Sequence, residues 1–128
     1  MSQENVELVR RALRAGRSEF AELLDPAIRL DLSERVFNPA VYEGFAGIMQ
    51  WHEEVKEVWQ SYLSEPEEFI DCDQIVVVLT RERGRGRGSG VELDRESALL
   101  YRLRAGRVTE IRHYHDRERA LRDARRAG

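Results

Sequence analysis

The second half of the chain changes from helical to strand-like patterning, and this change constrains the fold more than any other feature. From Tyr62 onward, β-branched and other apolar residues mostly alternate with polar ones, in segments separated by short turns. The exception is Ile75–Thr80, a continuous apolar run that is typical of a central strand buried on both faces. Because short turns join antiparallel neighbours, the pattern predicts a sheet of hairpins. The predicted strands are 62–71, 75–80, 91–103 and 107–116.

The first half of the chain is predicted to be mainly helical. Apolar residues recur at helical spacing, and Ile28–Leu32 is the one stretch that alternates strictly, as a half-buried strand does. Residues 33–42 are predicted to form a loop, and Asp116 is expected to cap a closing helix. The predicted helices are 2–15, 19–24, 44–59 and 117–127. This order predicts an α+β fold in which helices pack over the open side of a curved antiparallel sheet.

Length and composition exclude several classes of protein. The 128 residues predict one domain, and the net charge of −3 gives no general attraction to nucleic acid or to anionic membranes. The single cysteine, Cys72, excludes an internal disulfide, and no apolar run is long enough to span a membrane. We therefore expect a cytoplasmic protein. The run Gly84–Gly90 is predicted to be a hairpin turn, because no helix follows it as a dinucleotide-binding loop requires.

The last strand carries two of the three histidines on one face. Side chains alternate along a strand, so Thr109, Ile111, His113 and His115 are expected to share a face, opposite Val108, Glu110, Arg112 and Tyr114. Histidines titrate near neutral pH and can act as acids or bases. A pair spaced by one residue is also half of a metal site, but the third histidine, His52, is expected to face outward, and no metal is predicted.

Three segments resemble the SnoaL-like branch of the NTF2-like superfamily. They are Leu24–Asp31, Tyr42–Trp51 and Leu103–Leu121, which contain the turns, the third helix and the last hairpin. The resemblance covers nearly the whole chain and implies a cone-shaped curved sheet with one cavity, for which the third helix forms a lid. It does not fix the chemistry, because this fold hosts isomerases, cyclases, dehydratases, epoxide hydrolases and non-catalytic binders.

Within that fold, similarity to ketosteroid isomerases assigns the general base to Asp31. Strand alternation alone favours a solvent-facing Asp31, opposite Leu30 and Leu32, whereas the resemblance places it in the cavity. The tyrosine that holds the oxyanion in those isomerases corresponds here to Val9, which argues against their particular reaction. Polyketide cyclases use a carboxylate on the later strands, and we identify no counterpart for it. Scytalone dehydratases use an aspartate with histidines, an arrangement that Asp31 and His113 would resemble.

Three hypotheses follow for function. The first is a cofactor-independent isomerase, cyclase or dehydratase in which Asp31 and His113 exchange a proton with a carbonyl compound. The second is a non-catalytic binder of a small hydrophobic molecule, and the third is an interaction domain whose cavity is filled. A homodimer is expected through the outer face of the sheet, with Arg112 and Tyr114. The expected ligand-binding residues are Tyr42, Phe45, Trp51, Arg81, Tyr101, Ile111 and His115. The alternative interpretation is that they are ordinary core or surface residues.

Overall fold

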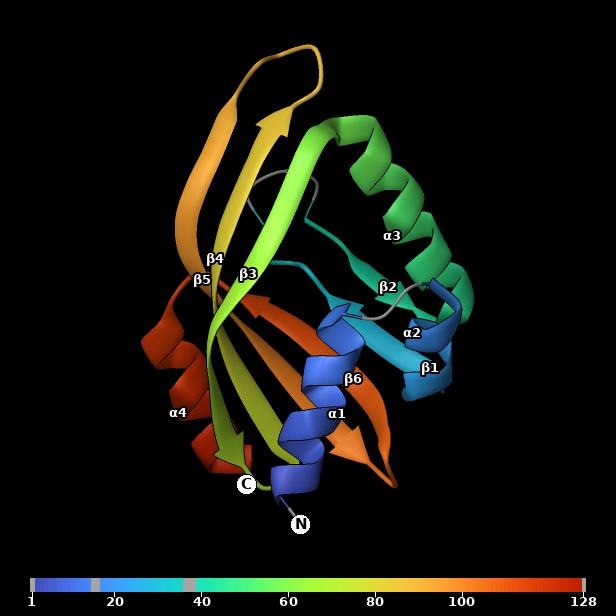
Figure 1. Ribbon diagram of the computed structural model, residues 1–128, viewed down its shortest axis with the longest axis vertical. Helices are drawn as coiled ribbons and strands as arrows, with labels where there is room; N and C mark the ends of the chain where they lie inside the picture. The colour runs from blue at the N-terminus through green and yellow to red at the C-terminus, as the bar shows by residue number, and fades with distance from the viewer. Residues whose placement is uncertain (1, 15–16, 36–38, 128) are drawn as a thin grey trace.

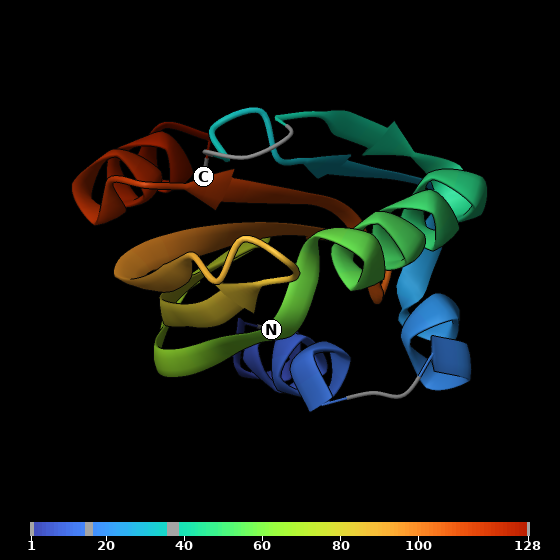
Figure 2. The same cartoon turned by 90° about the horizontal axis from the view of Figure 1, so that it is seen from above.

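The chain folds into one strongly curved, unclosed sheet with helices on both of its faces (Figures 1 and 2). The computed structural model describes residues 2–14, 17–35 and 39–127. Within these ranges no helix is both long and apolar enough to cross a membrane. The elements in chain order are α1 (Ser2–Arg14), α2 (Arg17–Leu23), β1 (Leu24–Asp31), β2 (Val41–Glu43), α3 (Gly44–Val58), β3 (Trp59–Cys72), β4 (Ile75–Gly86), β5 (Glu92–Arg104), β6 (Arg107–Tyr114) and α4 (Arg117–Ala127).

The α+β class is confirmed, with one difference in the pairing of strands. The sheet order is β2-β1-β6-β5-β4-β3, and all neighbours are antiparallel except β1 and β6. In that parallel pair Leu30 lies opposite Ile111. The pattern of hairpins predicted only antiparallel pairs, because a parallel partner from the other end of the chain leaves no turn signal in the sequence. The short strand β2 lies in the predicted loop, where three residues are too few to show alternation.

Two apolar cores lie on opposite faces of the sheet. Helices α1, α2 and α3 cover the concave face, and α4 covers the convex face (Figure 2). Strand β4 contributes to both, as predicted: Val76 and Val78 belong to the concave core, whereas Ile75 and Val77 pack in the core under α4. Pro66 lies on the edge strand β3 at a register shift, as expected of a residue that has no N–H to donate within a sheet.

A bulge at Thr109 changes the face assignment in the last strand. The pairing with β5 shifts there, because Arg102 lies opposite Glu110 while Leu103 lies opposite Val108. Val108 is consequently buried in the concave core together with Ile111, although strict alternation put them on opposite faces. The alternation holds beyond the bulge, so Ile111 and His113 face the concave side as predicted.

Tyr114 is buried beneath α4 and is not available to a second copy of the chain. It is 1% exposed, and its hydroxyl donates a hydrogen bond of 2.8 Å to Asp123 of that helix. The guanidinium groups of Arg112 and Arg119 lie over its ring at 4.9 and 5.4 Å. The expectation that Tyr114 forms part of a dimer surface is therefore wrong, because the closing helix already covers it.

The cap of α4 gives a first testable prediction. The Oδ1 of Asp116 accepts hydrogen bonds from the backbone N–H groups of Glu118 at 2.9 Å and Arg119 at 3.3 Å, which confirms the predicted N-cap. We expect Asp116→Ala to lower the free energy of unfolding by about 1 kcal/mol in urea titrations. The control is Asp116→Asn, which keeps a capping oxygen and should stay close to the wild type. Equal losses in both variants would contradict the capping role.

Candidate functional site

A cavity of about 270 Å³ lies between the concave face of the sheet and helices α1 to α3. Its walls are mostly apolar and carry five aromatic side chains, namely Phe20, Trp51, Trp59, Tyr62 and Tyr101. The polar lining residues are Arg35, His52, Ser64, Glu82, Arg95 and His113. Cavities that hold small ligands have this character, with apolar walls and a few polar groups that fix orientation.

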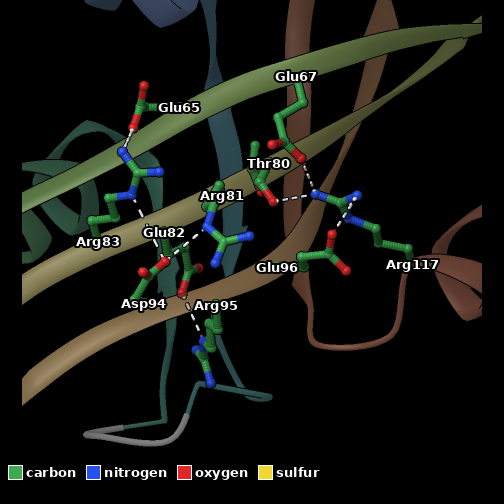
Figure 3. A network of polar contacts seen from close by, with 10 residues as sticks. All are labelled: Glu65, Glu67, Thr80, Arg81, Glu82, Arg83, Asp94, Arg95, Glu96 and Arg117. Atoms are coloured by element: carbon green, nitrogen blue, oxygen red, sulfur yellow. Dashed lines mark hydrogen bonds and ion pairs between the residues drawn. The ribbon is translucent and has the colours of Figure 1, made fainter.

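The strand register brings three of these polar groups together. Glu82 lies directly opposite Arg95 in the β4–β5 pair, and β6 adds His113 beside them. One carboxylate oxygen of Glu82 (Oε1) is hydrogen-bonded to Nε2 of His113. The other, Oε2, accepts a hydrogen bond of 2.9 Å from Nε of Arg95. Figure 3 shows Glu82 and Arg95 on adjacent strands.

Glu82 is held in its ionised form by these neighbours. It is 3% exposed, and His113 is 4% exposed. Burial by itself raises the pKa of Glu82, but the hydrogen bond and charge of His113, followed by those of Arg95, lower the pKa to about 2. A buried carboxylate with such a low pKa orients the imidazole next to it and stabilises positive charge on that ring.

His113 has one ring nitrogen left for another molecule. Its Nε2 is bonded to Glu82, while its Nδ1 is buried and has no hydrogen-bond partner among the residues that the structure describes. Buried polar atoms usually have a partner, so an exception calls for an explanation. His113 is therefore oriented by Glu82, it belongs to the cavity lining, and its Nδ1 is the ring nitrogen that has no partner.

Tyr62 places a phenol beside the same carboxylate. The residue is 38% exposed overall, but its hydroxyl lies at the buried end, near the carboxylate of Glu82. Burial, and then the negative charge of Glu82, raise the pKa of this phenol well above its usual value. Tyr62 is thus a neutral hydrogen-bond donor at the polar end of the cavity.

The carboxylate that meets His113 is Glu82, and Asp31 lies elsewhere. Asp31 ends β1 with its side chain on the convex face, where it accepts hydrogen bonds from the hydroxyl (2.6 Å) and the backbone N–H (3.0 Å) of Ser33. The guanidinium groups of Arg29 and Arg112 are each 3.9 Å from its Oδ2. Burial raises the pKa of Asp31, but the Ser33 hydrogen bonds and the two arginines lower it overall. The expected Asp31–His113 pair is not formed, because Leu30 and Leu32 occupy the cavity face of this segment.

The residues expected to bind a ligand divide into two groups. Trp51, Tyr101 and Ile111 line the cavity, as does His113. The others, Tyr42, Phe45, Arg81 and His115, lie outside the lining. The sequence pattern did not determine which face of its strand or helix each of these residues would occupy.

Tyr42 is buried in the concave core with its hydroxyl hydrogen-bonded to Glu54, and Phe45 is 42% exposed on α3. His115 follows β6 and is exposed, with its ring centroid 5.5 Å from that of His113. Burial, and then the charge of Arg95, lower the pKa of His115. Arg81 points to the convex face, where its Nε donates a hydrogen bond of 2.8 Å to Asp94.

Four residues of the polar part of the site were missed from the sequence, namely His52, Tyr62, Glu82 and Arg95. His52 was expected to face outward, but it lines the cavity and its ring stacks on Phe20 with centroids 6.3 Å apart. Glu82 was missed because the predicted strand stopped at Thr80, whereas β4 continues to Gly86. Continuing the alternation beyond Val78 and Thr80 places Glu82 on the cavity face, and this was the signal available.

The described residues contain no group of three or more histidine, cysteine, aspartate or glutamate side chains arranged to hold a metal ion. Of the two histidines of the last strand, His113 is bonded through Nε2 to Glu82, and His115 is exposed.

Comparison with solved structures identifies the fold. An NTF2-like protein from Burkholderia xenovorans superposes with a TM-score of 0.79 and 21% identity, covering 95% of this chain and 96% of the other. A proposed SnoaL-like polyketide cyclase from a Jannaschia species gives 0.73 and 23%, covering 99% and 94%. A protein with a ketosteroid isomerase-like fold from Catenulispora acidiphila, in complex with trimethylamine, gives 0.71 and 16%, covering 86% and 85%.

Comparison at the level of sequence reveals no relative of this chain. No family model matches the chain, and no curated protein matches it either. The likeness is therefore one of architecture, supported by solved structures that each align over most of both chains. The chain has the NTF2-like fold, as its resemblance to SnoaL-like proteins implied.

Proposed function

We propose that the chain is a small-molecule enzyme in which His113, oriented by Glu82, transfers a proton to or from a carbon next to a carbonyl group. The observation that carries this proposal is the buried Glu82–His113 pair in a mostly apolar cavity, with Nδ1 of His113 still available. The reaction class is that of an isomerase, cyclase or dehydratase. The proposal keeps the class expected from the sequence and replaces Asp31 by Glu82.

The proton transfer requires only groups that the cavity supplies. Nδ1 of His113 takes a proton from the carbon, and the electron pair moves onto the carbonyl oxygen to give an enolate. Glu82 stabilises the imidazolium that forms, as a carboxylate does for a histidine base. The phenol of Tyr62 lies at the same end of the cavity, where it can donate a hydrogen bond to the enolate oxygen. Returning the proton to another position of the substrate completes an isomerisation.

The similarity to the Jannaschia and Catenulispora proteins supports a role with small molecules. The first is described as a proposed polyketide cyclase and the second holds trimethylamine. The walls of this cavity favour a compact, largely apolar ring system, since five aromatic side chains line it. The interaction-domain hypothesis requires a cavity filled by side chains of the chain itself. The lining side chains instead leave about 270 Å³ open, which favours a small-molecule ligand.

Exchange of a carbon-bound proton with solvent tests the proposal directly. We expect the wild type to accelerate deuterium exchange at C1 of 2-tetralone in D₂O, followed by proton NMR, above the rate in buffer. His113→Gln should lose about 100-fold or more of the acceleration, and Glu82→Gln should also lose most of it. Asp31→Asn separates the two assignments of the carboxylate and should retain the rate. Binding without any acceleration would mean a non-catalytic binder, and loss in Asp31→Asn alone would overturn the Glu82 assignment.

A further inference from the structure

The charges on the two faces of the β4–β5 hairpin are balanced differently. On the convex face, three arginines are paired with four carboxylates: Arg81 with Asp94, Arg83 with Glu65 and Asp94, and Arg117 with Glu67 and Glu96 (Figure 3). On the concave face, the single carboxylate of Glu82 serves both Arg95 and His113. On the cavity side, therefore, Arg95 has one carboxylate, and it shares that carboxylate with His113.

Carboxylates are also few in the whole cavity lining. Two arginines, Arg35 and Arg95, line the cavity, and Glu82 is the one carboxylate among its described lining residues. The guanidinium of Arg35 also contacts the Tyr42 hydroxyl at 3.3 Å, close to Glu54. Arg95 is the arginine that shares the polar end of the cavity with Glu82.

Arg95 is held in a way that leaves a fork of donors for another molecule. Its Nε binds Glu82 at 2.9 Å, and its two terminal nitrogens have no hydrogen-bond partner among the described residues. The side chain is 22% exposed, so the guanidinium lies where the cavity meets solvent. A planar guanidinium fixed at one nitrogen can bind a carboxylate with two parallel hydrogen bonds through the others.

We propose that the ligand carries a carboxylate beside its apolar ring system and that Arg95 is the residue that selects for it. This inference rests on the proposed function, since it names the class of molecule for the same cavity. The apolar ring would lie against the aromatic walls, and the carboxylate would bind the terminal nitrogens of Arg95 at the mouth. That position gives the terminal nitrogens of Arg95 a partner and keeps the carboxylate out of the apolar interior, where burial would be costly.

Cationic ligands are disfavoured by the same residues. The aromatic side chains alone would suit an ammonium group, and the Catenulispora neighbour was solved with trimethylamine. Here, however, Glu82 is already engaged by Arg95 and His113, so no free carboxylate in the described lining remains to balance a cation. The residues at the polar end of the cavity therefore favour an anionic ligand over a cationic one.

Three naphthalene probes of similar size and different charge test the proposal. Affinities of the wild type for 2-naphthoate, 2-naphthylmethanol and 2-naphthylmethylammonium would be measured by calorimetry. We expect 2-naphthoate to bind about tenfold or more tightly than the neutral alcohol, and the ammonium to bind most weakly. Equal affinities, or a preference for the ammonium, would overturn the inference while leaving a cavity that binds rings. Failure of all three probes to bind would instead count against the proposed function itself.

Variants locate the selectivity in Arg95. Arg95→Met should abolish the preference for 2-naphthoate over the alcohol, and Arg95→Lys, which keeps the charge but not the fork, should retain only part of it. The matched control is Arg85→Met, because Arg85 faces Glu92 across the same two strands at 2.6 Å but lies outside the cavity. A preference that survives in Arg95→Met would overturn the assignment. The comparison of the three probes with the wild type remains decisive if a variant does not fold.

Discussion

Glu82→Ala is expected to lower the free energy of unfolding by about 3 kcal/mol, more than a change at any exposed carboxylate of this sheet. The substitution leaves the buried imidazole of His113 without its partner and removes the one carboxylate that Arg95 binds. Removing one member of a buried charged pair costs more than the pair contributes, because the remaining group is desolvated without compensation. For a chain of this size the melting temperature should fall by roughly 10 °C.

Glu92→Ala is the matched control for this experiment. Glu92 also pairs with an arginine directly across the β4–β5 ladder, at 2.6 Å from Arg85, but its side chain is 70% exposed. Exposed pairs contribute less than about 1 kcal/mol, so this variant should unfold close to the wild type. Both would be measured by urea denaturation at pH 7. Similar losses in the two variants would show that the Glu82 network contributes no more than a surface ion pair.

Strand alternation predicted the cavity face well wherever the strands are regular. Ile111 and His113 were placed together on one face, and Val76 and Val78 were expected to be buried. Alternation also put Asp31 opposite Leu30 and Leu32, and the structure agrees. It was the resemblance to ketosteroid isomerases that moved Asp31 into the cavity. A periodicity of two is imposed by the backbone, whereas a functional residue can change position between relatives that share a fold.

The features that the sequence did not reveal are those that depend on contacts between distant segments. The bulge at Thr109 and the parallel pairing of β1 with β6 have no local signal strong enough to read. Glu82 lies between Arg81 and Arg83, so its immediate neighbours are typical of an exposed strand end. It is buried because β5 and β6 bring Arg95 and His113 to it. A buried charge is tolerated only with such partners, and these come from other strands.

Acid should remove the stabilisation that Glu82 provides. The pKa of this carboxyl is about 2 in the folded protein and 4.5 without its partners. A group whose pKa is lowered by folding stabilises the protein above its unfolded pKa, and that contribution is lost as the pH falls from about 4.5 towards 2. A shift of this size corresponds to about 3 kcal/mol as an upper value.

Glu82→Gln separates this contribution from the other carboxyls, including Asp31, whose pKa is also lowered. The variant should be less stable than the wild type at pH 6, and the difference should shrink steadily below pH 4.5 until the two stabilities converge near pH 2. Urea titrations at intervals of pH would give both curves. Asp31→Asn is the comparison, because Asp31 is bonded to Ser33 on the other face and its loss should leave the Glu82 contribution intact. Parallel curves for the wild type and Glu82→Gln across this range would mean that His113 and Arg95 do not lower the pKa of Glu82. The proposed stabilisation of the His113 imidazolium by Glu82 would then have no support.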